Sequence, residues 1–103
     1  MEMVLTGEFM NAEEANMRGL VSRVTEVNET VNEAVRVALK IAGYSQPVIQ
    51  LAKEAVNQSY EMGLESGLLY ERRMFHASFG FKDRVEGMTA FVEKRKPNFT
   101  DEQ

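Results

Sequence analysis

The chain has 103 residues, 44% of them hydrophobic, and a formal net charge of -4. This length and composition are typical of one modest domain, and the acidic balance argues against a nucleic-acid-binding surface. The absence of cysteine excludes disulfides, thiolate metal ligands and cysteine nucleophiles, and no apolar run is long enough to span a membrane.

The first quarter of the chain predicts one short helix followed by an extended segment. Asn11 and Glu14 form a capping-box-like start for a helix over Ala12–Arg18. Gly19 follows at the position where a left-handed residue commonly ends a helix. The β-branched alternation of Val21–Val24 indicates a short strand or an extended link.

The middle of the chain predicts three helices separated by glycine. Asn28 is the expected cap of the first, whose regular apolar stripe ends at Gly43. Ser45 is the expected cap of the second, which has a narrow face of small residues suited to close packing against a neighbour. The third helix is expected between Gly63 and Gly80, where apolar residues recur at helical spacing.

The last predicted helix begins with a second capping-box pattern at Asp83 and Glu86 and is closed by Pro97. Its last turn is expected to contain the cations of Lys94–Lys96, which would complement the helix dipole. The predicted fold is therefore mostly all-α, with about four to five helices and at most one short strand. We expect residues 1–103 to form a single domain.

No residue pattern predicts catalysis or metal binding. The single histidine, His76, lacks a nearby orienting carboxylate and is interpreted as structural or solvated. The carboxylates of Glu61 and Glu65 are interpreted as a solvated pair because no apolar residues bracket them. The candidate ligand-binding pair is Phe91 with Lys94, since a ring beside a cation suits a ligand with an aromatic or acyl part and a phosphate. The dipole interpretation of the cations remains the alternative.

The segment Asp83–Phe99, which reads DRVEGMTAFVEKRKPNF, closely resembles the C-terminal signature of the crotonase (enoyl-CoA hydratase/isomerase) superfamily. Within that superfamily it is most like the mitochondrial short-chain enoyl-CoA hydratases. Leu5–Gly7, Ala12–Val24 and Ala52–Asn57 resemble family segments that precede it, in the same order. The resemblance covers the whole chain.

The resemblance implies hydration of trans-2-enoyl-CoA in fatty-acid β-oxidation, without a cofactor, in the mitochondrial matrix. The two catalytic glutamates and the oxyanion-hole N–H groups of the family belong to a preceding ββα-repeat core. No residue of this chain matches those motifs, so no catalytic residue is assigned. The same resemblance implies that Phe91 lines the acyl or pantetheine passage and that Lys94 approaches the CoA phosphates, in a site completed by a neighbouring subunit.

We therefore expect the C-terminal helical domain of an enoyl-CoA hydratase, a trimer or hexamer when intact, and no activity from this chain alone. Met1–Leu5 looks like the last turn of a helix that begins upstream, which supports a fragment. One alternative is a piece of another crotonase, such as an isomerase or a branched-chain hydratase. A second alternative is a stand-alone helical module that self-associates through exposed apolar faces.

Overall fold

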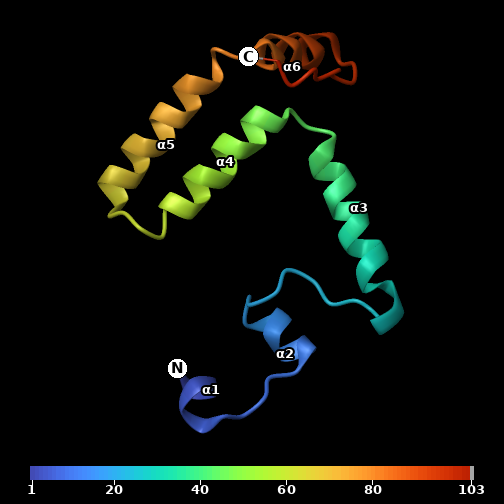
Figure 1. The fold of residues 1–103 in the computed structure, drawn as a ribbon, viewed down its shortest axis with the longest axis vertical. Helices are drawn as coiled ribbons and strands as arrows, with labels where there is room; N and C mark the ends of the chain where they lie inside the picture. The colour runs from blue at the N-terminus through green and yellow to red at the C-terminus, as the bar shows by residue number, and fades with distance from the viewer. Residues whose placement is uncertain (103) are drawn as a thin grey trace. The chain divides into compact units, whose positions relative to one another are not determined.

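The computed structural model describes residues 1–102, and over that range its regular secondary structure consists of helices joined by loops, with no strand (Figure 1). The prediction of an all-α fold is therefore confirmed, and the short strand that the sequence allowed is not formed. The first residues form a short helix, as the helical turn expected at Met1–Leu5 predicts. The elements in chain order are α1 (Glu2–Thr6), α2 (Ala12–Met17), a 3-10 helix (Val27–Glu29), α3 (Thr30–Ala42), α4 (Gln46–Gln58), α5 (Leu64–Ser78) and α6 (Lys82–Glu93).

The chain comprises two compact units, residues 1–36 and the residues from Val37 onward. In the first unit, α2 begins as the sequence predicts, because the Asn11 side chain accepts a hydrogen bond from the Glu14 N–H at 2.8 Å. Gly19 has the expected left-handed conformation, with φ at 75°. Val21–Val24 is irregular rather than a strand, since no described segment pairs with it.

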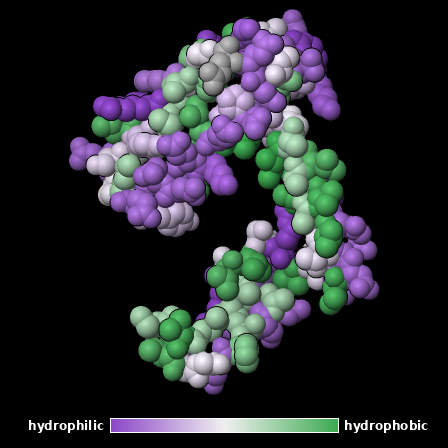
Figure 2. All heavy atoms as spheres, in the orientation of Figure 1, coloured by the Kyte–Doolittle hydropathy of each residue, from purple (hydrophilic) through white to green (hydrophobic). Residues whose placement is uncertain are grey.

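The predicted cap of α3 is wrong. Asn28 lies inside the 3-10 helix instead of preceding α3, which starts at Thr30 without a break. The 3-10 turn supplies backbone partners, including the Glu29 N–H to the Glu26 carbonyl at 2.9 Å, so a side-chain cap is not needed here. The stripe on α3 is exposed, with Val31 and Leu39 at 72% and 69% of their full accessibility, and Figure 2 shows the hydrophobic residues along this helix.

In the second unit, α4 and α5 lie side by side as a helical hairpin (Figure 1). Ser45 takes the N-cap position of α4 as predicted, but its hydroxyl makes no capping bond. The Gln46 N–H is satisfied instead by the Asp101 carboxylate at 2.6 Å. The hairpin is also joined by a hydrogen bond from the Tyr70 hydroxyl to Glu54.

The prediction of a capping box at the start of α6 is wrong. The helix begins at Lys82 after Phe81, which makes no side-chain cap. The Asp83 carboxylate accepts the N–H groups of Thr100 and Asp101 at 2.9 and 3.0 Å. The segment that follows α6 thus folds back to the first turn of the same helix.

Small residues on α6 allow this return. Ala90 is 1% exposed, and a Cβ built on Gly87 would lie 3.5 Å from the Phe99 ring. The only hydrophobic side chains classed as buried among residues 1–102 are Ala15 and Ala90. Most large apolar side chains therefore remain on the surface. None of the described helices is both long and apolar enough to cross a membrane.

Candidate functional site

The ring and the cation that the sequence brings together lie at the C-terminal end of α6. Phe91 belongs to the last turn and is 83% exposed, and Lys94 immediately follows the helix and is also exposed. Both side chains are open to a ligand in this unit. The structure holds the residues but no ligand contact, so their role in binding CoA stays a prediction.

The three cations do not lie in the last turn of α6, contrary to expectation, because the helix ends at Glu93. Lys94 adopts the left-handed conformation, with φ at 55° and ψ at 36°, and so turns the chain before Pro97 is reached. The Arg95 N–H bonds to the Ala90 carbonyl at 3.0 Å, which is the bond of a Schellman motif that spans five residues. A left-handed turn, rather than the proline, ends this helix.

The three cations differ in what they contact. Arg95 forms a bidentate pair with Glu86, at 2.6 and 2.9 Å, and its Nε donates to Glu93 at 2.6 Å. Neither Lys94 nor Lys96 forms an ion pair with any residue in the described range. The cluster therefore offers two lysines to an anion and keeps its arginine for internal contacts.

These contacts strongly favour the ionised form of Glu86. Its pKa is lowered to about 2, first by the hydrogen bonds from Arg95 and then by the Asn98 N–H, which lies 2.7 Å from the carboxylate. The same ion pair raises the pKa of Arg95. The sequence does not reveal this role of Glu86, because its partners lie in the segment that returns to α6.

Asp83 is the buried carboxylate of the unit, at 2% exposure. The nearby Ser45 hydroxyl, which lies outside good hydrogen-bond geometry, and the backbone N–H of Thr100 lower the pKa of Asp83. Because these contacts favour the charged form, the carboxylate acts as an acceptor for backbone amides. It is a structural group rather than a general acid.

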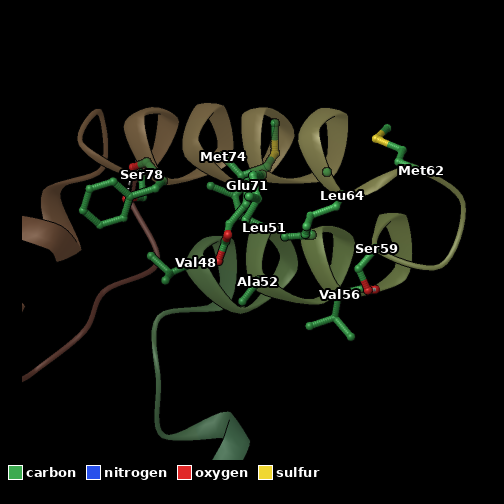
Figure 3. Close-up of a pocket in the computed structure, with 15 residues that line it drawn as sticks. Val48, Leu51, Ala52, Val56, Ser59, Met62, Leu64, Glu71, Met74 and Ser78 are labelled. Atoms are coloured by element: carbon green, nitrogen blue, oxygen red, sulfur yellow. Dashed lines mark hydrogen bonds between the residues drawn. The ribbon is translucent and has the colours of Figure 1, made fainter.

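A groove of about 510 Å³ runs between α4 and α5. Figure 3 shows Leu51 and Leu64 between the two helices and Glu71 extending from α5 toward α4. The small-residue face predicted for α4 contributes Ala52 and Ala55 to the groove. Because these residues line an open groove and Ala52 is exposed, the close packing that this face predicts is not observed at these positions.

Among the described residues, no catalytic groups are brought together at the end of α6 or in the groove between α4 and α5. His76 lies beside Phe75, with ring centroids 6.1 Å apart. Over residues 1–102, no three His, Cys, Asp or Glu side chains are grouped as a metal site would require. Another charge cluster is in the first unit, where Arg36 and Arg23 lower the pKa of Glu33 to about 2. That cluster is consistent with a solvated ion network.

Comparison with known proteins defines the class. The family model for enoyl-CoA hydratase/isomerase matches residues 1–102. The chain belongs to this family, whose C-terminal signature the sequence of α6 resembles.

Individual relatives agree with this assignment. A probable mitochondrial enoyl-CoA hydratase of Dictyostelium discoideum is 56% identical over 99 residues, which are 96% of this chain and 36% of that protein. A probable enoyl-CoA hydratase of Mycobacterium bovis is 49% identical over 97% of this chain and 39% of its own length. The crystal structure of an enoyl-CoA hydratase subunit from Geobacillus kaustophilus superposes with a TM-score of 0.93 at 38% identity, over 98% of this chain and 39% of that one. The chain thus spans less than two fifths of these relatives.

Proposed function

We propose that residues 1–103 are a single C-terminal helical domain of an enoyl-CoA hydratase, which adds water to trans-2-enoyl-CoA in fatty-acid β-oxidation. The observation that carries the proposal is the family match over residues 1–102, together with relatives named as enoyl-CoA hydratases. The chain spans 36% and 39% of those two relatives. This supports a catalytic core in the remainder of the protein.

The contribution of this domain is to bind CoA. Phe91 offers an exposed ring for the acyl or pantetheine part, and Lys94 offers an ammonium without an internal partner in the described range. Acyl-CoA is the substrate of the complete enzyme, and no cofactor is required. A neighbouring subunit of the oligomer completes the site. A single exposed lysine–phosphate contact is weak by itself, so the isolated chain binds CoA weakly.

Hydration of crotonyl-CoA tests the proposal that catalysis belongs to the ββα core and not to this chain. The purified chain shows no hydration above the uncatalysed rate, because it contains no matching glutamates or oxyanion donors. An enzyme that contains this domain after the ββα core hydrates the same substrate. Turnover by the chain alone, after removal of host hydratase, would refute this division of roles.

The role of Lys94 has its own test in the core-containing enzyme. Lys94→Ala raises KM for the acyl-CoA by about three- to fivefold, the loss of one exposed charge contact, while kcat changes less. Lys96→Ala is the matched control, since it removes an adjacent unpaired cation. An unchanged KM in Lys94→Ala would favour the dipole interpretation.

Self-association is a second role, supported by the exposed apolar surface. Leu39, Val56 and Leu68 are 69%, 59% and 51% exposed, and exposed apolar patches of this kind drive association. The isolated chain therefore forms a dimer or a higher oligomer. Light scattering that finds a monomer at high concentration would contradict this role. If the chain oligomerises but does not bind CoA, the alternative that it is a stand-alone interaction module is favoured.

The remaining choices concern the particular hydratase and its compartment. The family model covers hydratases and isomerases together, so an isomerase or a branched-chain hydratase is the alternative parent. Hydration of crotonyl-CoA by the core-containing enzyme separates a hydratase from an isomerase, and its rate relative to a branched 2-enoyl-CoA separates a straight-chain from a branched-chain hydratase. We place the protein in the mitochondrial matrix on the strength of the Dictyostelium relative, although a bacterial relative also matches. Imaging of the tagged full-length protein tests that location.

A further inference from the structure

The end of α6 carries a lysine in a backbone conformation that favours glycine. Lys94 has φ at 55° and ψ at 36°. Its N–H bonds to the Phe91 carbonyl at 3.3 Å, and the next N–H bonds to the Ala90 carbonyl at 3.0 Å. Glycine is the usual residue at this position, because a Cβ is disfavoured there. A side chain that is retained under such strain points to a function for it.

The residue after Lys94 stabilises this turn. Arg95 forms a bidentate ion pair with Glu86, at 2.6 and 2.9 Å, nine residues earlier on α6. Glu86 also accepts the Asn98 N–H at 2.7 Å. One carboxylate thus holds the chain on the C-terminal side of Lys94 against the helix on its N-terminal side.

The same contacts leave Arg95 little capacity for an external anion. Its Nε, Nη1 and Nη2 donate to Glu93 and Glu86, and Nη1 also approaches the Lys96 carbonyl at 3.4 Å. A guanidinium has five N–H donors in a fixed planar arrangement, so most of its directions are used. The ammonium of Lys94 has no such partner in the described part of the chain.

We propose that Arg95 and Glu86 are positioning residues, whose ion pair holds the left-handed turn at Lys94 and so places its ammonium for the CoA phosphates. Arg95 itself does not contact the phosphates. The inference rests on the proposed role of Lys94 in binding CoA. It assigns different functions to two adjacent cations: Lys94 contacts the ligand, and Arg95 positions Lys94. The sequence alone does not distinguish them.

The test is a calorimetric titration of the core-containing enzyme with coenzyme A, because a neighbouring subunit completes the site there. Lys94→Ala and Arg95→Lys each raise Kd by about three- to fivefold, the range of one exposed charged contact. Arg95→Lys keeps the charge but loses the bidentate geometry, so a purely electrostatic contribution would survive it. The double variant binds no more weakly than Lys94→Ala, because Arg95 acts through Lys94.

Glu86→Gln gives the sharper discrimination. It removes a negative charge beside the anion site, so simple electrostatics predicts tighter CoA binding, whereas loss of positioning predicts weaker binding. The HN–Hα coupling of Lys94, which reports its φ angle, is measured by NMR in the 103-residue chain without ligand. It changes in Glu86→Gln if the left-handed turn relaxes. Lys82→Gln is the matched control, since it removes another ion pair of the returning segment, to Glu102 at 2.6 Å, and leaves CoA binding unchanged.

Each result has a defined meaning. Unchanged binding by Arg95→Lys, or tighter binding by Glu86→Gln, overturns the positioning role while Lys94→Ala still weakens binding. Unchanged binding by Lys94→Ala, or no binding by the unmodified core-containing enzyme at millimolar CoA, overturns the CoA assignment itself and the positioning role with it. Amide protection in α6 is measured for every variant, and weaker binding by Arg95→Lys supports the inference where that protection is retained.

Discussion

Replacing Lys94 with glycine should stabilise the chain while removing its exposed cation. The left-handed conformation costs a residue with a Cβ about 1 to 2 kcal/mol, and Lys94 adopts it with φ at 55°. Glycine avoids that cost but loses about 0.5 to 1 kcal/mol more backbone entropy on folding. The net expectation is a gain of about 0.5 to 1 kcal/mol for Lys94→Gly.

Amide exchange measures this gain where it arises. Protection of the N–H groups of Lys94 and Arg95, which close the Schellman motif, should rise about two- to fivefold in Lys94→Gly. Lys94→Ala should leave it nearly unchanged, because alanine keeps the Cβ. Lys96→Gly is the control at a position without positive φ and should lower stability. Protection in Lys94→Gly no higher than in Lys94→Ala would refute the strain argument.

Three further outcomes follow from α6. Gly87→Ala should raise the free energy of unfolding by about 0.5 to 1 kcal/mol, because alanine loses less backbone entropy than glycine in a helix. The added Cβ fits, since it meets the Phe99 ring at an ordinary 3.5 Å. Gly87→Leu should lower the unfolding temperature in the same thermal assay. Asp83→Asn should speed exchange of the Thr100 amide roughly tenfold, because a charged acceptor is lost, and unchanged exchange would contradict the contact. Glu86 should titrate at about 2 by NMR; since its folded pKa is lowered, its contribution to stability is complete above the ordinary value of 4.5 and is lost as pH falls toward 2. A midpoint near 4.5 would show that the ion pair does not persist in solution.

Two segments with the same spacing show what local sequence can and cannot predict. Asn11 and Glu14 form the expected cap, because both partners lie within the first turn of α2. Asp83 and Glu86 have the same spacing, yet each bonds to the segment after the helix; Asp83 reaches Thr100, 17 residues away. Local patterns describe local bonds well, whereas a returning chain competes for the same carboxylates.

The candidate site divides in the same way. Sequence identifies Phe91 and Lys94 through a resemblance and an exposed ring beside a cation. It does not distinguish Lys94 from Arg95, because that difference depends on where Glu86 lies in space. The predicted end of α6 is also too late, because Pro97 is the evident helix-ending residue in the sequence and lysine rarely adopts the left-handed conformation that ends the helix at Glu93.

The open groove between α4 and α5 has a consequence inside a cell. Its lining includes Leu51, Leu64 and Met74, and uncovered apolar side chains are what chaperones bind and what leads to aggregation. We therefore expect the newly made chain to last longer in a cell when another protein surface covers this groove. Coexpression with such a partner should raise its steady-state abundance without any change in synthesis.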